Sequence, residues 1–405
     1  MIFVTRIWKR LLRADNFFAS IVVFLILAVI PFIFNNDLLR PFKETLTDFR
    51  ITDVAFSRIK DHSMENVRFD LVVVNVDTCS KTSLAQLIII LNQYNPKVIA
   101  IDDVVWESDS TDSGESFLKD VIVHFKNIVV QSHLEGYSGN KNIFAENTII
   151  DNFKTGDVPY GYDNLFISED RSISTLRRFM PKALVENRIE LSFPVRVVRE
   201  FNEKIADDFL VRNNFYETIY YKGQNVFIVE DGSAVLAGEA NPEMFANKIV
   251  LLGSLNPASS HESFDNLYFT PIDSIYSGRS KPEMTSTTIF ANIIAMILDA
   301  KYFTTMPDWV GILIAFIFCY INMAYFSFIT ERRKRWYEFE SLIVFLIESV
   351  FLLVVDVYIF LEYRIELKLT MALVASGAST MVFEGYMFSL KPVFIKGFYK
   401  FFPKR

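Results

Sequence analysis

The amino-acid sequence predicts a membrane protein in which an exported α/β domain with a mainly parallel sheet is joined to four transmembrane helices, one N-terminal and three C-terminal. Three observations predict this architecture. An uncharged apolar run opens the chain, strand and helix patterns alternate in its middle, and three long apolar runs close it. The chain is 51% hydrophobic and 15% aromatic, which is too apolar for a purely soluble protein.

The first apolar run, residues 17–34, carries no charge and comes after four basic residues, Arg6, Lys9, Arg10 and Arg13. About 18 apolar residues cross the hydrocarbon core of a bilayer as a helix, and positive charge marks the cytoplasmic end. The run closes without the small-residue pair of a signal-peptide cleavage site. We therefore interpret residues 1–34 as a cytoplasmic N-terminus with an uncleaved anchor that exports the middle of the chain.

Three further spans are predicted within residues 307–390, at residues 309–330, 341–361 and 369–390. Residues 331–335 are basic apart from the first, and residues 391–405 form a basic tail. Both basic groups fall on the cytoplasmic side if the N-terminus does, so the positive-inside rule places both termini in the cytoplasm. Abundant Phe, Lys and Asn with few Gly suggests a bacterial genome, and hence an inner-membrane protein with a large periplasmic domain.

The middle of the chain is acidic. Residues 1–34 carry a net charge of +3 and residues 307–405 a net +2, which leaves −12 for residues 35–306 within the total of −7. An acidic domain argues against a nucleic-acid partner. The two cysteines, Cys79 and Cys319, would be separated by the membrane, so we expect no disulfide within one chain.

Short β-branched runs alternate with amphipathic stretches through residues 35–306. The runs predict strands at residues 71–77, 98–103, 128–130 and 248–253. The amphipathic stretches predict helices at residues 83–94, 116–125, 191–201 and 286–298. Residues 218–223 and 226–229 resemble a pair of strands near a glycine turn. Alternation of this kind indicates a parallel sheet.

Acidic residues end two of these strands. Asp77, Asp102 and Asp103 lie at carboxyl ends, where ligands of parallel sheets usually bind. With Asp265 they could form an oxygen-rich cleft for a polar ligand or a cation. The alternative is that each one caps the helix or loop that comes after it.

No catalytic motif is present. The sequence lacks a nucleophile elbow, a P-loop, a dinucleotide fingerprint and a His-Glu-x-x-His pair. His261 and Glu262 have no second histidine at a ligating spacing. We therefore expect no enzymatic activity, no catalytic residue, no metal and no cofactor.

Three acids fall inside predicted spans, Glu348 and Asp356 in the third and Glu384 in the fourth. At a rise of about 1.5 Å per residue, Glu348 and Glu384 lie about 10 Å and about 9 Å from the cytoplasmic ends of adjacent antiparallel helices. Such groups usually face protein or water. They could pair with Lys or Arg of a partner or share a proton, or else they are neutral or reach the interface.

The fourth span also carries small residues at spacings that allow close helix packing, namely Ala372, Ala375, Ser376, Ser379 and Thr380.

The order of these pieces resembles the type 2 CHASE family of extracellular sensory domains associated with cyclases and histidine kinases. The resemblance spans roughly residues 35–390 and is carried by short stretches: Asp48-Phe49-Arg50, residues 72–77, residues 97–102, Asp170-Arg171 with Arg177, residues 248–253, Asp265 with Thr270-Pro271, and Ala291-Asn292. The chain departs from the family at residues 78–81, where a Trp-Pro-Trp-Arg-like stretch is usual, and at Phe290, where His is frequent.

The resemblance implies a sensory domain with ligand-binding candidates Asp77, Asp102, Asp103, Asp170, Arg171, Asp265 and Asn292. The residues after Leu390 are too few for a kinase or cyclase. We therefore expect a non-enzymatic inner-membrane sensor or adaptor in the lipid bilayer that works through separate membrane or periplasmic proteins, with a homo-oligomer allowed. The alternatives are a structural subunit of an envelope-spanning complex and, less favoured, a proton- or ion-conducting protein.

Overall fold

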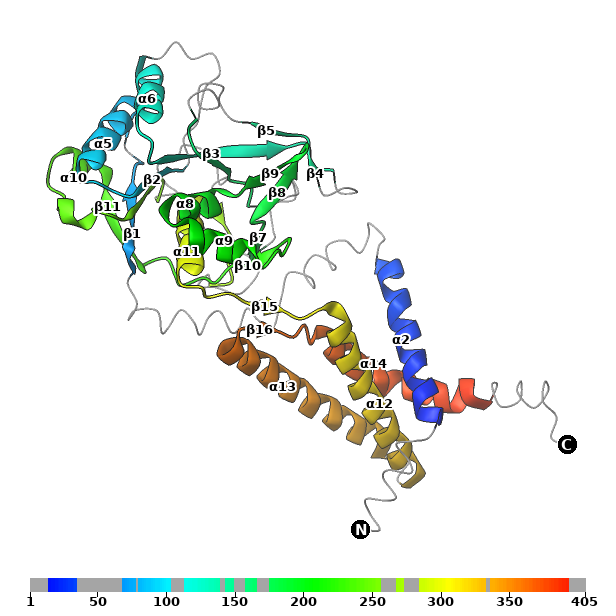
Figure 1. Ribbon diagram of the computed structural model, residues 1–405. Helices are drawn as coiled ribbons and strands as arrows, with labels where there is room; N and C mark the ends of the chain where they lie inside the picture. Colours follow the sequence, from blue (N-terminus) through cyan, green and yellow to red (C-terminus); the bar gives the residue numbers. More distant parts are fainter. Residues whose placement is uncertain are drawn as a thin grey trace. The chain divides into compact units, whose positions relative to one another are not determined.

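The computed structural model describes residues 14–34, 68–77, 79–102, 113–138, 143–148, 157–165, 175–255, 267–272, 284–332 and 336–392 (Figure 1). The chain divides into two compact units. One, here called the sheet unit, is Phe56–Phe303, and the other, here called the helical unit, combines Met1–Ala55 with Thr304–Arg405.

The sheet unit is built on a seven-stranded sheet with the order β11-β1-β12-β2-β3-β5, and β6 also pairs with β3. The strands are β1 (Arg68–Asn75), β2 (Val98–Ile101), β3 (Ile128–Glu135), β5 (Glu146–Thr148), β6 (Tyr160–Tyr162), β11 (Phe227–Asp231) and β12 (Ile249–Gly253). Every pairing in it is parallel except that of β3 with β5. The predicted mainly parallel sheet is confirmed.

Helices cover both faces of this sheet (Figure 1). One face carries α5 (Lys81–Gln93), α6 (Ser113–His124) and α10 (Gly232–Leu236), and the other carries α8 (Phe193–Phe201), α9 (Glu203–Leu210) and α11 (Ser286–Leu298). Side chains alternate across a strand, so Val72 and Val74 join the core with α5 and α6. Leu71 and Val73 are equally buried on the opposite face.

Smaller elements extend the sheet unit. A three-stranded sheet joins β4 (Ile143–Phe144), β8 (Lys182–Val185) and β9 (Arg188–Leu191), and short pairs join β7 (Arg178–Phe179) to β10 (Glu217–Thr218) and β13 (Leu267–Tyr268) to β14 (Met284–Thr285).

The predicted pairing of residues 218–223 with 226–229 is wrong. β10 pairs with β7, whereas β11 pairs in parallel with β1. The two segments separate because the backbone N–H groups of Lys222 and Gly223 donate to Asn292 on α11, which draws the chain away from a hairpin.

The helical unit contains α2 (Ala14–Phe34), α12 (Asp308–Arg332), α13 (Tyr337–Tyr363) and α14 (Thr370–Gly385), which continues as the π-helical turn η6 (Tyr386–Leu390). A short parallel pair joins β15 (Thr304–Thr305) to β16 (Ile365–Glu366). By length and composition, α12 and α13 are candidate membrane spans, and the apolar part of α2 is shorter. Two of the four predicted spans therefore meet this criterion.

Helix α14 packs against α2, α12 and α13. Its small residues Ala372, Ala375, Ser376 and Ser379 are fully buried, so the close packing expected of them is present. A Cβ on Gly377 would lie 3.2 Å from the ring of Phe345 on α13.

A buried carboxylate joins α5 to α6 in the sheet unit. Glu115 is 1% exposed, and its oxygens lie 2.5 Å from Lys81 Nζ and 2.7 Å from Lys119 Nζ. Burial raises the pKa of this carboxyl, but hydrogen bonds and charge from Lys119 and Lys81 outweigh burial and lower its pKa from 4.5 to about 2.

This lowered pKa predicts a pH dependence of stability. A depressed carboxyl pKa stabilises the folded chain above its unfolded value of about 4.5, and the contribution disappears as pH falls toward about 2. The melting temperature of the detergent-solubilised full chain should exceed that of Glu115→Gln at pH 7, and the gap should shrink between about pH 5 and about pH 3. A gap independent of pH would contradict this assignment.

Candidate functional site

Four neighbouring strands end in polar residues at one edge of the large sheet. Taken in their spatial order, β11 ends at Asp231, β1 is followed by Asp77, β12 by Ser254 and β2 by Asp102. This carboxyl edge is where parallel sheets usually bind ligands, and we take it as the candidate site of the sheet unit.

Asp102 connects this edge to helix α11. Its side chain is only 2% exposed, and its Oδ2 accepts hydrogen bonds from Ser286 Oγ at 3.1 Å and Thr287 Oγ1 at 2.7 Å. The N-cap of α11 is Thr285, which accepts from the backbone N–H of Thr288. Asp102 therefore anchors the first turn of α11 to the sheet by its side chain.

Helix α11 begins directly against the end of β12. A Cβ added to Gly253 would lie 2.2 Å from Thr287 Oγ1 and 2.6 Å from its Cγ2. Only a glycine leaves room for this approach, so the Lys248–Gly253 run ends in the residue that lets α11 reach Asp102.

Asp77 is half-buried and accepts a hydrogen bond from the hydroxyl of Ser254. Asn75 Oδ1 accepts from the backbone N–H groups of Asp77 and Leu255 at 3.4 Å and 3.3 Å. Burial raises the pKa of the nearby Cys79 thiol, and the charges of Asp231 and Asp77 add to the rise. The edge thus presents carboxylate, amide and hydroxyl groups beside a protonated thiol, a set suited to hydrogen bonding a polar ligand.

Asn292 lies on α11 and is completely buried. Its Oδ1 accepts from the N–H of Lys222 at 2.7 Å and of Gly223 at 3.3 Å. Its Nδ2 donates to the carbonyls of Gly223 and Thr288 at 3.0 Å and 2.9 Å. All these bonds go to the backbone, so Asn292 fixes the 222–223 segment on α11.

The other sequence-derived ligand candidates, Asp103, Asp170, Arg171 and Asp265, lie outside the described residues. Within the described ranges, no group of three His, Cys, Asp or Glu side chains could hold a metal ion. Cys79 and Cys319 are both free thiols.

A second polar assembly, which no sequence motif indicated, holds the end of the sheet unit. Arg212 donates to Glu217, which is 2% exposed, at 2.8 Å and 3.2 Å. The same guanidinium donates to the carbonyl of Phe303 at 2.8 Å and lies 4.7 Å from the ring centre of Tyr302. We call Arg212, Glu217, Tyr302 and Phe303 the exit clamp. Its two halves, residues 212–217 and 302–303, are far apart in sequence, so no spacing pattern indicates it.

In the helical unit, Glu348 belongs to a polar network between three helices. Its Oε2 accepts from Asn322 Nδ2 of α12 at 2.8 Å and from the hydroxyl of Ser376 of α14. Asn322 is 1% exposed and also contacts Ser379. Sequence reasoning missed Asn322, although an amide within an otherwise apolar span is a recognisable signal.

The expected common depth of Glu348 and Glu384 is corrected by this packing. Helix α13 begins at Tyr337, before residue 341, and the Tyr337 hydroxyl donates to the Thr380 carbonyl. Glu348 instead faces Ser376, two turns of α14 before Glu384, which is about 12 Å along the helix axis.

Asp356 is 3% exposed and faces the backbone at the end of β16. The backbone of Leu367 is hydrogen bonded to its carboxyl, Glu366 lies nearby, and its Oδ1 has no hydrogen-bond partner within the described part of the chain. Glu366 is itself buried and accepts from the hydroxyl of Thr305 at 3.3 Å. Asp356 is thus directed into the protein at the opposite end of α13 from Tyr337.

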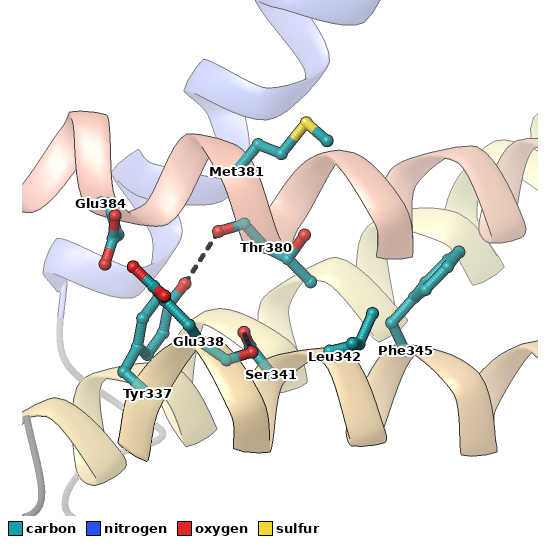
Figure 2. A pocket seen from close by; sticks show the side chains of 8 residues that line it. All are labelled: Tyr337, Glu338, Ser341, Leu342, Phe345, Thr380, Met381 and Glu384. Carbon is teal, nitrogen blue, oxygen red and sulfur yellow. Dashed lines mark hydrogen bonds between the residues drawn. The ribbon is translucent and has the colours of Figure 1, made fainter. Parts of the chain in front are cut away.

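Glu384 lines a pocket of about 280 Å³ between α13 and α14 (Figure 2). Its lining residues are Tyr337, Glu338, Ser341, Leu342, Phe345, Thr380, Met381 and Glu384. The pocket combines two carboxylates at one end with apolar side chains further along the two helices.

Two substitutions of Glu348 separate the contribution of its charge from that of its hydrogen-bond acceptor. Glu348→Gln keeps an oxygen that can accept from Asn322 and Ser376, so we expect a loss of at most about 1 kcal/mol. Glu348→Leu removes the acceptor from buried donors and should lower the free energy of unfolding by about 1–3 kcal/mol. Chemical denaturation of both variants in detergent checks this, and equal losses would contradict it.

A family model described as the CHASE2 domain matches residues 23–324, which is most of the chain. No curated protein and no solved structure matches it. The matched range includes the whole sheet of the sheet unit, its carboxyl edge and helix α11. The chain therefore belongs to the CHASE2 family, whose domain is an extracellular sensory domain.

Proposed function

We propose that this protein is a non-enzymatic sensor or adaptor of the inner membrane. Its sheet unit lies in the periplasm and detects a polar ligand or an envelope protein at the carboxyl edge of the sheet. It passes its state through the helical unit to separate partner proteins. The observation that carries this proposal is that α11 begins at that edge and that the next helix in the sequence is α12, the first candidate span after it.

The first turn of α11 is bound to Asp102, and the helix is buried along most of its length. After it ends, the Tyr302 hydroxyl donates to the Ile297 carbonyl and Arg212 holds the carbonyl of Phe303. A displacement of the first turn of α11 therefore reaches Phe303 through packed and hydrogen-bonded structure.

The first residues of the helical unit after Phe303 are hydrogen bonded within that unit. Thr304, the residue after Phe303, donates its backbone N–H to the Arg364 carbonyl at 2.8 Å. Met306 donates to the Glu366 carbonyl at 3.0 Å, and α12 begins at Asp308. The backbone is therefore hydrogen bonded on each side of the Phe303–Thr304 bond, which supports the proposal that a signal passes from the sheet unit to the helical unit.

We further propose that α2 and α14 with η6 also cross the bilayer, giving four spans with both termini in the cytoplasm. Three features support this topology. The 21 residues of α2 come after a basic segment, α14 with η6 continues to Leu390 before a basic tail, and Lys391 pairs with Asp15 of α2 at 2.7 Å. This pair supports a topology in which the start of α2 and the end of the fourth span lie at one level of the membrane.

Hydrogen–deuterium exchange of the full chain in detergent tests the α11 route. Asp102→Ala releases the first turn of α11, so we expect faster exchange of the Thr304 and Met306 amides than in the wild type. Asp77→Ala is the matched control, because Asp77 lies on the same edge and bonds Ser254 instead of α11. Faster exchange at the start of α11 with unchanged exchange at 304–306 would contradict the proposal.

A structural subunit of an envelope-spanning complex is the second candidate, and the exposed apolar face of α13 favours it. That face includes Phe339, Leu342, Leu346, Ile347 and Val350. A purely structural role does not require coupling between the carboxyl edge and β15. The same exchange experiment therefore separates the two functions.

A further inference from the structure

The groove between α13 and α14 has the composition of a docking surface (Figure 2). Glu338 and Glu384 are exposed, and neither forms an ion pair with any residue in the described ranges. The hydroxyls beside them donate elsewhere, Tyr337 to the Thr380 carbonyl at 2.8 Å and Ser341 to the Glu338 carbonyl at 3.0 Å. The groove therefore offers two negative charges that complement a cationic occupant.

Apolar side chains lie further along the groove. Leu342 is 54% exposed and Met381 is 82% exposed, and Phe345 lies beside them. Going from Glu338 toward Phe345 along α13, the lining changes from carboxylate to apolar. An occupant with basic groups next to aromatic or aliphatic ones would complement both parts.

The chain itself carries such a segment at the same end of α13. Arg332, Arg333, Lys334 and Arg335 directly precede this helix. Trp336 and Phe339 come after them, are 56% and 57% exposed, and contact each other edge to face with ring centres 6.1 Å apart. In the sequence, four basic residues thus come directly before two exposed aromatic rings at the end of α13 that lines the groove.

We propose that this groove receives the basic segment 332–335 of a second copy of the chain, so that the protein pairs through α13. This inference rests on the membrane topology proposed above, because copies inserted in the same direction bring residues 332–335 of one to the level of Glu338 and Glu384 of the other. A two-fold axis along the membrane normal makes the contact reciprocal, as in most homodimers. The exposed apolar face of α13 continues the interface into the bilayer.

Cross-linking between two differently tagged copies tests the proposal in native membranes. Both copies are full-length and lack natural thiols through Cys79→Ser and Cys319→Ala. One carries Met381→Cys, which leaves both carboxylates in place, and the other carries Arg333→Cys. A bis-maleimide should link the two tags at least tenfold more than when Met371→Cys, at the opposite end of α14, replaces Met381→Cys.

Charge variants then test the role of the carboxylates. The double variant Glu338→Gln and Glu384→Gln should lower cross-linking at least tenfold, whereas Glu340→Gln, on the same helix and outside the groove, should leave it unchanged. No cross-link above the Met371→Cys level, or a cross-link that survives loss of both carboxylates, would overturn the proposal. A charge-dependent cross-link to a different protein would overturn it as well.

These outcomes are distinguishable from failure of the sensor proposal. Unchanged exchange at residues 304–306 in Asp102→Ala rejects the α11 route and leaves the groove untouched. Loss of cross-linking with altered exchange retained rejects the groove and leaves the sensor.

Discussion

Replacing Arg212 with methionine is expected to lower the free energy of unfolding by about 3–5 kcal/mol. The substitution leaves Glu217 buried without its cation, and removing one partner of a buried ion pair has an effect of this size. Glu217 is 2% exposed and would retain one side-chain donor among its known contacts, Asn214 Nδ2 at 2.9 Å. The same substitution frees the Phe303 carbonyl and removes the cation over the Tyr302 ring.

Thermal unfolding of the full chain in detergent measures this effect. For a unit of this size, about 1 kcal/mol corresponds to about 2–4 °C, so the melting temperature should fall by about 10 °C. Arg199→Met is the matched control, because the Arg199–Glu203 pair is exposed on α8 and α9 and should contribute less than about 1 kcal/mol. Equal losses in the two variants would show that the exit clamp is only a surface contact.

Replacing Gly253 with alanine is expected to destabilise the sheet unit by about 1–3 kcal/mol, the usual effect of overpacking. The new Cβ would lie 2.2 Å from Thr287 Oγ1, so the first turn of α11 must move away from β12 and from Asp102. The change acts on packing alone and leaves both the carboxylate and the hydroxyls of the anchor in place.

A double-mutant cycle identifies the cause. Thr287→Ala removes the atoms that clash but also loses the 2.7 Å bond to Asp102, so by itself it should lower stability by about 1–2 kcal/mol. In the Gly253→Ala background, Thr287→Ala should cause a smaller loss of stability, because removing the threonine side chain relieves the clash with the new Cβ. Additive losses would show that Gly253 does not act through Thr287.

The sheet and its main helices could be predicted from local pattern. Buried parallel strands are continuous β-branched runs, so residues 71–77 and 248–253 identify β1 and β12. Helix α11 was predicted with its observed bounds because an apolar run begins immediately after a polar N-cap, Thr285. The carboxyl-edge position of Asp77 and Asp102 also results from chain order, since it requires only that the strands be parallel.

Contacts between distant segments could not be predicted in this way. The exit clamp joins Arg212 to Phe303, 91 positions away, and no periodicity encodes such a pairing. The strand partners of β10 and β11 depend on Asn292, which lies some 70 residues further along. The relative depth of Glu348 and Glu384 was mispredicted because α13 begins at Tyr337, which packs against Phe383 with ring centres 5.3 Å apart, and hydropathy does not register that contact.

The sensor proposal and the groove proposal both require that the sheet unit and residue 336 lie on opposite sides of the membrane. Labelling with a membrane-impermeant maleimide tests this directly, in chains that lack natural thiols and carry a single new cysteine. Val211 of the sheet unit is 80% exposed and Trp336 is 56% exposed, so both positions accept the reagent. In bacterial cells with a permeabilised outer membrane, Val211→Cys should be labelled at once and Trp336→Cys only after the inner membrane is broken. Labelling of Trp336→Cys in sealed cells, or protection of Val211→Cys, would contradict the account.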